Sequence, residues 1–250
     1  MKQIEIKILN PEAVYEAEKM MAFTARLTQR GHKIQNMDDL MTLFEKPADL
    51  TKALSSLPHP TIQKFGVINV AVVGASRRFL AQITRHQNEV KFMSASLQYS
   101  DYSDNNSFCV PYEVMEIGAE LDYLRDCERA MEKYKALAAV AGNDAAGYLA
   151  PQGLRNILII SATPFQWIHM IRQRSCRRNT KETQYVMLRI WEQLYSLCPE
   201  WFSCCGPFCT RGKCEEGKMA CGHPIKKTFT PTDILKEDFP LLMKEDKAHV

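Results

Sequence analysis

The apolar positions of this chain fall into runs of two kinds, which predict strands and helices. Residues 2–9 have isoleucine at every second position, which predicts a strand with one buried face. Residues 65–73 are apolar and β-branched and form the best strand candidate in the chain. Residues 154–162 form another apolar run, which is either a strand or the buried beginning of a helix, because periodicity does not separate the two.

Other segments have the spacing or the capping residues of helices. Residues 10–31 begin with Asn-Pro, a suitable N-cap followed by proline in the first helical position, and predict a helix. Shorter helices are expected over residues 36–47 and 49–57. The amphipathic pattern of residues 113–140 predicts one long helix. A single helix is also predicted over residues 163–197, which begin with Thr-Pro.

The stretch of residues 72–102 has the most informative polar pattern. Its apolar run stops at Gly74, and Ser76 is a suitable N-cap for the helix that follows. One face of this helix is apolar, and another has the polar series Arg78, Gln82, Arg85 and His86. Guanidinium, amide and imidazole groups at one helix end can hold a phosphate or an enolate-like oxygen. The alternative interpretation is a solvated polar face.

Composition narrows the class of protein. A chain of 250 residues suits one domain, or one domain with an appendage. An apolar content of 46% and a charged content of 24% are ordinary for a globular protein, and a net charge of +3 is too small to indicate a nucleic-acid partner. The N-terminal residues lack the apolar region of a signal peptide, and no run of about 18 apolar residues predicts a membrane span. We therefore expect a cytoplasmic protein without a membrane partner.

The chain contains nine cysteines, most of them crowded into residues 198–227. Without a secretion signal, this crowding indicates metal ligation before disulfides. A tetrahedral zinc ion would fold such a loop, and the predicted ligands are Cys205, Cys209, Cys214 and Cys221. Cys204 and His223 are alternative ligands; free or redox-active thiols and an iron–sulfur cluster are alternative interpretations. The tail of residues 228–250 is expected to be loosely attached.

Two further positions, Arg174 and His59, have side chains suited to binding or catalysis. Arg174 lies at the edge of the predicted buried face of helix 163–197, where a guanidinium needs an anionic partner. The alternative is a basic solvent face with one snorkelling arginine. His59 lies between two prolines before a strand, and a lone histidine is more often structural or exposed than functional.

These residues resemble one family. VVGASRRFLAQITRH is similar to the segment that flavin-dependent thymidylate synthases have before their signature R-H-R-x7-S, and SASLQYS resembles the end of that signature. The sequence His59-Pro60-Thr61 lies where the family has a histidine and a Ser/Thr before its first core strand. Residues 149–151 occupy the position of the family's A-R-x-x-L-P motif, and Arg174 occupies that of its substrate-activating arginine. The resemblance covers residues 1–195.

The resemblance implies an α+β fold, with an antiparallel sheet packed with long helices, over residues 1–197. It also implies a homotetramer in which several chains share each active site. The implied reaction converts dUMP to dTMP: methylenetetrahydrofolate supplies the carbon unit, and FAD, reduced by NADPH, supplies the hydride. In such chemistry the flavin carries the redox step and the protein orients it.

Roles follow from the resemblance position by position. Arg174 and Ser96 would be catalytic. The implied dUMP contacts are Gln82, Arg85, Ser94, Ser96, Gln98 and Arg174. The implied FAD contacts are His59, Thr61, Arg85, His86, Gln87, Ser94, Thr163 and His169.

The signature itself departs from the family pattern. It reads R-H-Q, so Gln87 replaces an arginine expected near the flavin phosphates. A strict count of seven residues ends at Ala95, whereas the match at Tyr99-Ser100 favours Ser96 as the signature serine. Ser94 then stands where the family usually has glutamate.

The expected dUMP phosphate contacts are also changed. Gln98 and Gly147 stand where the family has arginines, and Arg155 or the pair Arg177 and Arg178 would have to compensate. Losing one charge-assisted contact costs about 1.5–3 kcal/mol. Two alternatives therefore stay open: a flavoprotein acting on another pyrimidine nucleotide, and a non-catalytic nucleotide-binding or zinc-stabilised interaction protein.

Overall fold

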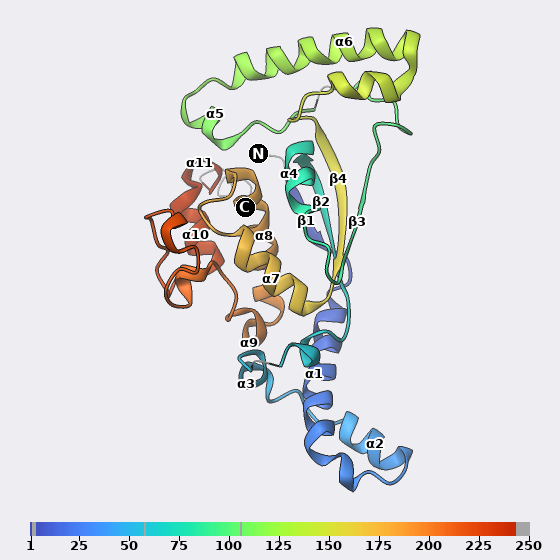
Figure 1. The fold of residues 1–250 in the computed structure, drawn as a ribbon, viewed down its shortest axis with the longest axis vertical. Helices are drawn as coiled ribbons and strands as arrows, with labels where there is room; N and C mark the ends of the chain where they lie inside the picture. The colour runs from blue at the N-terminus through green and yellow to red at the C-terminus, as the bar shows by residue number, and fades with distance from the viewer. Residues whose placement is uncertain (2–3, 58, 106, 244–250) are drawn as a thin grey trace.

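The computed structural model describes residues 1, 4–57, 59–105 and 107–243. Its centre is a four-stranded sheet in the order β1-β2-β4-β3 (Figure 1). The strands are β1 (Glu5–Ile8), β2 (Ile68–Ser76), β3 (Val90–Ser94) and β4 (Arg155–Ala162). Every pairing between neighbouring strands is antiparallel. The expected α+β class with an antiparallel sheet is confirmed.

The strands form because alternate residues supply one buried face. Val70 and Val72 of β2 pair with Ile160 and Leu158 of β4, and all four side chains are buried. The ambiguous run 154–162 is therefore a strand. The expected first strand is confirmed as β1, although residues 2 and 3 lie outside the described part of the chain. Strand β3 was not predicted, because the exposed Met93 breaks the alternation of apolar and polar residues in its sequence, VKFMS.

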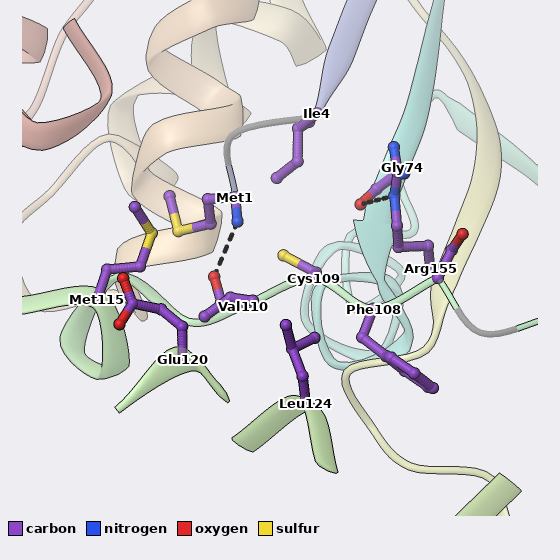
Figure 2. A pocket seen from close by; sticks show the side chains of 11 residues that line it. Met1, Ile4, Gly74, Phe108, Cys109, Val110, Met115, Glu120, Leu124 and Arg155 are labelled. Carbon is purple, nitrogen blue, oxygen red and sulfur yellow. Dashed lines mark hydrogen bonds between the residues drawn. The ribbon is translucent and has the colours of Figure 1, made fainter. Parts of the chain in front are cut away.

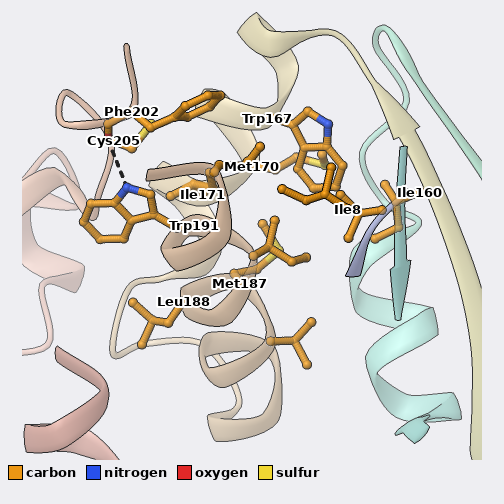
Figure 3. Close-up of a cluster of buried hydrophobic side chains, with 14 of the residues drawn as sticks. Ile8, Ile160, Trp167, Met170, Ile171, Met187, Leu188, Trp191, Phe202 and Cys205 are labelled. Atoms are coloured by element: carbon orange, nitrogen blue, oxygen red, sulfur yellow. Dashed lines mark hydrogen bonds between the residues drawn. The ribbon is translucent and has the colours of Figure 1, made fainter. Parts of the chain in front are cut away.

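Helices cover one face of the sheet. These are α4 (Arg77–Ile83), α7 (Pro164–Arg174) and α8 (Lys181–Leu197), with α7 and α8 packed against each other. The core between them and the sheet contains Trp167, Met187 and Trp191 (Figure 3). The indole of Trp167 donates to the carbonyl oxygen of Ile68 at 3.0 Å, which satisfies a buried polar group and ties α7 to β2.

The opposite face of the sheet has no helix over it in Figure 1. Its central side chains are apolar and exposed: Val73 of β2, Ile157 of β4 and Met93 of β3. Val73 pairs directly with Ile157, so these side chains form one band across the sheet. A contiguous apolar surface of this kind is typical of an interaction site.

The N-terminal helices are α1 (Glu12–Arg30), α2 (Met37–Phe44) and α3 (Thr51–Ser55), and α3 leads to a 3₁₀ turn, η2 (Pro60–Gln63). Asn36 caps α2 by accepting a hydrogen bond from the Asp39 amide at 2.9 Å. Asn10, in contrast, does not cap α1 with its side chain. Its amide joins the start of β2, donating to Val67 and accepting from Asn69, so the predicted cap was wrong.

The helix predicted over residues 113–140 is two helices. Helix α5 (Tyr112–Glu116) and α6 (Glu120–Ala146) are separated at Gly118, whose φ of +68° suits glycine. Helix α6 also runs beyond residue 140, across a break at Gly142, and leads to the 3₁₀ turn η3 (Gly147–Leu149).

The helix predicted over residues 163–197 is also two helices, α7 and α8. They are separated by residues 175–180, and Thr180 caps α8 by accepting a hydrogen bond from the Thr183 amide. The side-chain amide of Asn179 donates to the backbone carbonyl oxygens of Gln173 and Cys176 at 2.8 and 3.1 Å. These bonds compete with helix continuation, which periodicity alone does not reveal.

The C-terminal residues pack firmly, which contradicts the expected loose tail up to residue 243. They form α9 (Pro199–Phe202), the 3₁₀ turns η4 (Phe208–Thr210) and η5 (Gly217–Met219), α10 (Pro231–Asp238) and α11 (Pro240–Met243). Ile234, Leu235 and Phe239 are fully buried in the same core as Trp167, and Thr230 forms a capping box with Asp233. The buried residues of α10, Pro231, Ile234 and Leu235, recur at i, i+3 and i+4 on one face, so they add to the core.

Candidate functional site

Arg174 and His86 meet at one end of the sheet. His86 follows the end of α4, and Arg174 is the last residue of α7. The Nε–H of Arg174 donates to Nε2 of His86 at 2.9 Å, and Nη1 donates to Oδ1 of Asn179 at 3.3 Å. Both partners are uncharged acceptors, so within the described residues these bonds orient the guanidinium without neutralising it.

The electrostatics of this corner favour an anionic ligand. Burial, followed by the charge of Arg174 and the nearby His169, lowers the pKa of His86 to about 4. Burial and then Arg85 lower the pKa of Arg174, and burial, Arg172 and Arg174 lower that of His169. The neighbouring charges that lower these three pKa values belong to arginine and histidine side chains. Such a cluster is stabilised when a negative ligand enters.

An open pocket of about 500 Å³ adjoins this cluster. Its lining residues come from η2, the β3 entry and α7: Lys64, Gln87, Asn88, Glu89, Phe165, Gln166 and His169. The ammonium of Lys64 lies 5.1 Å from the ring centroid of Phe165. The pocket thus combines an aromatic face, amides, an imidazole and the Lys64 ammonium with the Glu89 carboxylate that pairs with it.

Thr163 positions the start of α7 beside the pocket. Its hydroxyl accepts a hydrogen bond from the backbone amide of Gln166 at 3.3 Å and donates one to the Glu89 carboxylate at 2.9 Å. Pro164 is the first residue of α7, where its missing N–H leaves no donor unpaired. The predicted Thr-Pro helix start is confirmed. Thr163 therefore lies beside the pocket that Gln87 and His169 line, at one end of the sheet.

Glu89 is a residue that sequence reasoning missed. Its φ of +54° is unusual for a residue with a side chain, and such strain persists where the surroundings hold it. Its carboxylate pairs with Lys64 at 2.6 Å as well as with Thr163. The Lys64 hydrogen bond is the main cause that lowers the Glu89 pKa. The only sequence signal was its place inside the signature stretch, between Gln87 and Ser96.

The remaining residues near this end are arranged more loosely. Gln82 lies on α4 and is half-buried, whereas Arg85 is exposed and close enough to lower the Arg174 pKa. His59 and Thr61 lie at η2, which packs against α7. His59 is exposed, which agrees with the simple interpretation of a lone histidine.

The loop of residues 94–98, called the serine loop, lies at the other end of the sheet. Val90 of β3 pairs with Ala162, just before Thr163, whereas Ser94 pairs with Leu158. A strand rises about 3.3 Å per residue, so the loop after Ser94 leads away from Arg174. Within one chain, Ser94, Ser96 and Gln98 do not line the pocket that Gln87 and His169 line.

The serine loop is a defined turn. The Ser96 hydroxyl accepts a hydrogen bond from the amide of Gln98 at 3.1 Å. Leu97 lies beside Gly147, since a Cβ on Gly147 would be 3.7 Å from that of Leu97. The two positions where family arginines are replaced, Gln98 and Gly147, are thus on neighbouring segments.

The comparisons with known proteins agree with this arrangement. A family described as "Thymidylate synthase complementing protein" (Thy1) matches residues 12–200. The chain belongs to this family.

Two curated relatives are flavin-dependent thymidylate synthases. The protein from Geobacter sulfurreducens is 24% identical over 225 residues, covering 88% of this chain and 96% of the relative. The protein from Clostridium tetani is 24% identical over 252 residues, covering 91% and 98%. The chain therefore spans nearly the whole of both relatives.

Solved structures share the fold. The UMP/dUMP methylase PolB from Streptomyces cacaoi, bound with 5-Br dUMP, has a TM-score of 0.63 and 13% identity, over 80% of this chain and 93% of that chain. Thymidylate synthase X from Helicobacter pylori, with FAD and dUMP, has a TM-score of 0.58 and 16% identity, over 80% and 97%. At these identities the likeness establishes the fold.

The cysteine segment lies beyond the matched Thy1 residues and does not form the predicted zinc site. In the part of the chain that the structure describes, no group of three or more His, Cys, Asp or Glu side chains is placed to hold a metal ion. Cys205 is fully buried in the main core, where burial raises its pKa. Cys209 and Cys221 instead accept hydrogen bonds from the backbone amides of Ile225 and His223. The crowding of cysteines did not reveal that one of them packs in the core.

A second pocket, of about 390 Å³, lies between α6 and the sheet (Figure 2). The Met1 amino group donates to the Val110 carbonyl oxygen at 2.8 Å, and Nε of Arg155 donates to that of Gly74 at 3.3 Å. Cys109 lines this pocket, with its pKa raised to about 12, mainly by burial. None of the predicted FAD or dUMP contacts lines it.

Across the described residues, every helix is too short or too polar to cross a membrane.

Proposed function

We propose that this protein is a flavin-dependent methyltransferase that converts dUMP to dTMP. In this proposal methylenetetrahydrofolate is the carbon donor, and NADPH reduces the bound FAD. The observation that carries the proposal is the Arg174 guanidinium, held by neutral His86 and Asn179 inside a cationic cluster beside an open pocket. Membership of the Thy1 family and the flavin-dependent relatives support it. A cytoplasmic location stays a prediction.

Arg174 is suited to polarise a pyrimidine. As a nucleophile, C5 of uracil is activated when negative charge gathers on the ring carbonyl oxygens. A guanidinium that already points at this position stabilises that charge without reorganising, and such a donor contributes about 3–4 kcal/mol to a barrier. His86 holds the guanidinium at Nε and leaves its outer nitrogen Nη2 for the substrate.

The residues around the pocket fit a flavin. Arg85 supplies positive charge for phosphates, the His169 imidazole supplies a hydrogen-bonding group, and Phe165 supplies an aromatic face beside the Lys64–Glu89 pair. Gln87 and Asn88 offer amide donors and acceptors for a polar ring edge. When bound, FAD supplies the hydride. The chain's own residues bind it, orient it and keep the neighbouring Arg174 in place.

The separation of the serine loop from Arg174 supports an active site that is shared between copies of the chain. We propose that Ser94, Ser96 and Gln98 of one copy complete the site formed by Arg174 of another. The bare apolar band of Val73, Ile157 and Met93 is a surface that such an assembly would bury. The expected homotetramer is part of this proposal.

The test begins with flavin. Purified protein, reconstituted with FAD, is expected to be yellow and to be bleached by NADPH. Reductive methylation is then measured with dUMP and methylenetetrahydrofolate, by chromatography of the nucleotide product. Formation of dTMP supports the proposal. Colourless protein that cannot be reconstituted with FAD overturns it and favours a non-catalytic nucleotide-binding protein.

A second candidate keeps the flavin and changes the nucleotide. It is favoured by Gln98 and Gly147, which remove positive charge where the family binds the dUMP phosphate. The fold shared with PolB, a UMP/dUMP methylase, also supports a wider substrate class. The assay is repeated with UMP, dCMP and CMP. Retained flavin, failure with dUMP and turnover of another of these nucleotides would select this candidate.

A further inference from the structure

The loop of residues 175–180, between α7 and α8, is anchored by the C-terminal part of the chain. Its charged members are Arg177 and Arg178. Arg177 contacts Asp238 and Glu237 of α10, and Arg178 pairs with Glu216. All three carboxylates lie beyond residue 200, where the family match ends.

Arg177 is the principal anchor. Its Nε donates to both oxygens of Asp238 at 3.0 Å, and Nη2 donates to Oδ1 at 2.7 Å. The Nη1 group donates to the carbonyl oxygen of His223 at 3.0 Å. The Asp238 carboxylate also accepts a hydrogen bond from the buried amide of Gln184, at 2.6 Å. A planar fork with a partner at each nitrogen has one geometry, so it holds its loop in one place.

The loop transmits this order to Arg174 through Asn179. The Asn179 side-chain nitrogen donates to Gln173 and Cys176, which closes the turn at the end of α7. The same side chain accepts from Nη1 of Arg174 at 3.3 Å. Arg177 lies between Cys176 and Asn179, inside the turn that these bonds close. Moving Arg177 therefore moves the acceptor that orients Arg174.

We propose that Asp238 is a positioning residue, which holds Arg174 in its substrate-activating orientation through Arg177 and Asn179. The proposal rests on the proposed function of Arg174. It gives the C-terminal helix α10 a role in the active site, although no α10 side chain need touch the nucleotide or the flavin.

The neighbouring Glu237 supplies a matched control. Both carboxylates pair with Arg177, but the Asp238 side chain is 6% exposed and that of Glu237 is 50% exposed. An exposed pair contributes little, whereas removing one partner of a buried pair leaves the other charge uncompensated. Asp238→Asn and Glu237→Gln remove the same charge, so their difference reports the buried contact.

The experiment uses the full chain and three measurements. Asp238→Asn is expected to lower kcat by about tenfold or more, since a misplaced catalytic group costs this much, with little change in the KM for dUMP. Amide hydrogen exchange at residues 175 and 179 should accelerate. The His86 pKa, followed by NMR, should rise toward 6.5, since Arg174 is one of the groups that lower it. Glu237→Gln should match wild type in all three.

A structural role alone would give another result. Asp238→Asn with a lower Tm, but with wild-type kcat and His86 pKa in the folded protein, would overturn the proposal. If Asp238→Asn does not fold, Asn179→Ala breaks the same link at its other end, and Gln173→Ala, at an exposed position of the same segment, is its control. Wild-type protein that methylates no nucleotide refutes the proposed function instead, whereas hydrogen exchange and the His86 titration still test the link to Arg174.

Discussion

Arg174 donates from Nε to Nε2 of His86 at 2.9 Å, so His86 must have its proton on Nδ1 and be neutral. A neutral imidazole orients the guanidinium and leaves its positive charge available for a ligand. Burial and the charge of Arg174 keep the His86 pKa near 4, so this state holds throughout the neutral range. The pair is therefore a fixed cationic donor rather than a proton shuttle.

Arg174→Ala should abolish turnover and leave flavin bound. Removing a donor that is aimed at developing charge costs about 3 kcal/mol or more, which is at least a hundredfold in kcat. Single-turnover methylation and flavin absorbance measure the two properties separately. Arg174→Lys retains the charge without the fork and is expected to recover little. Activity of Arg174→Ala within a few-fold of wild type would refute the assigned role.

The His86 pair also predicts a pH dependence of stability. The folded-state pKa is about 4, below the ordinary value of 6.5, so the unfolded chain binds the proton more tightly. Stability should therefore fall as the pH drops from 6.5 to 4, and this contribution should then level off. Chemical denaturation across this range measures it. His86→Gln keeps an acceptor for Arg174 and does not titrate, so its stability should depend less on pH over the same interval.

Gln98→Arg tests the phosphate site. If residue 98 faces the nucleotide phosphate in the assembled site, restoring a guanidinium adds a contact of about 1.5–3 kcal/mol. The KM for dUMP should then fall about tenfold or more, while that for the nucleoside deoxyuridine stays unchanged. Tyr99→Arg, which adds the same charge at an exposed neighbour, is the control. Equal effects of both variants would assign the gain to overall charge.

Ile157→Glu tests the bare face of the sheet. A carboxylate in the apolar band should dissociate an assembly that buries this face. The activity should then be lost, while the single chain stays folded. Analytical ultracentrifugation and circular dichroism measure these outcomes. Lys52→Glu changes charge at an exposed position of α3, outside the sheet, and should leave the assembly intact. A monomeric wild-type protein would contradict the shared site.

Gly66→Ala should destabilise the fold more than Gly118→Ala. Both glycines have positive φ, which costs alanine about 1 kcal/mol. At Gly66 an added Cβ would also lie 2.8 Å from the Cβ of Ala17 on α1, whereas at Gly118 nothing lies within 4 Å. Overpacking against a helix costs about 1–3 kcal/mol more. The free energy of unfolding in denaturant measures the difference, and equal values would show that α1 gives way.

Local patterns were sufficient to predict several elements. The alternation of β1, the Ser76 cap of α4 and the Thr-Pro start of α7 depend on residues close together in the sequence, so they could be recognised there. The signature stretch indicated the family for the same reason. The interruptions at Gly118 and at residues 175–180 were missed, since apolar spacing continues across them; the positive φ of Gly118 ends one helix, and the side-chain bonds of Asn179 and Thr180 end the other.

By itself the sequence determined the family, the helical and strand patterns and the arginine on which the proposed chemistry depends. Only the tertiary structure decided which polar residues meet. It placed His86 against Arg174, separated Ser96 from both, withdrew Cys205 into the core and brought Asp238 to Arg177. The physical reason is distance along the chain: Arg174 and His86 are 88 positions apart, and Arg177 and Asp238 are 61 apart. Such contacts are set by how helices pack on the sheet, which no local pattern records.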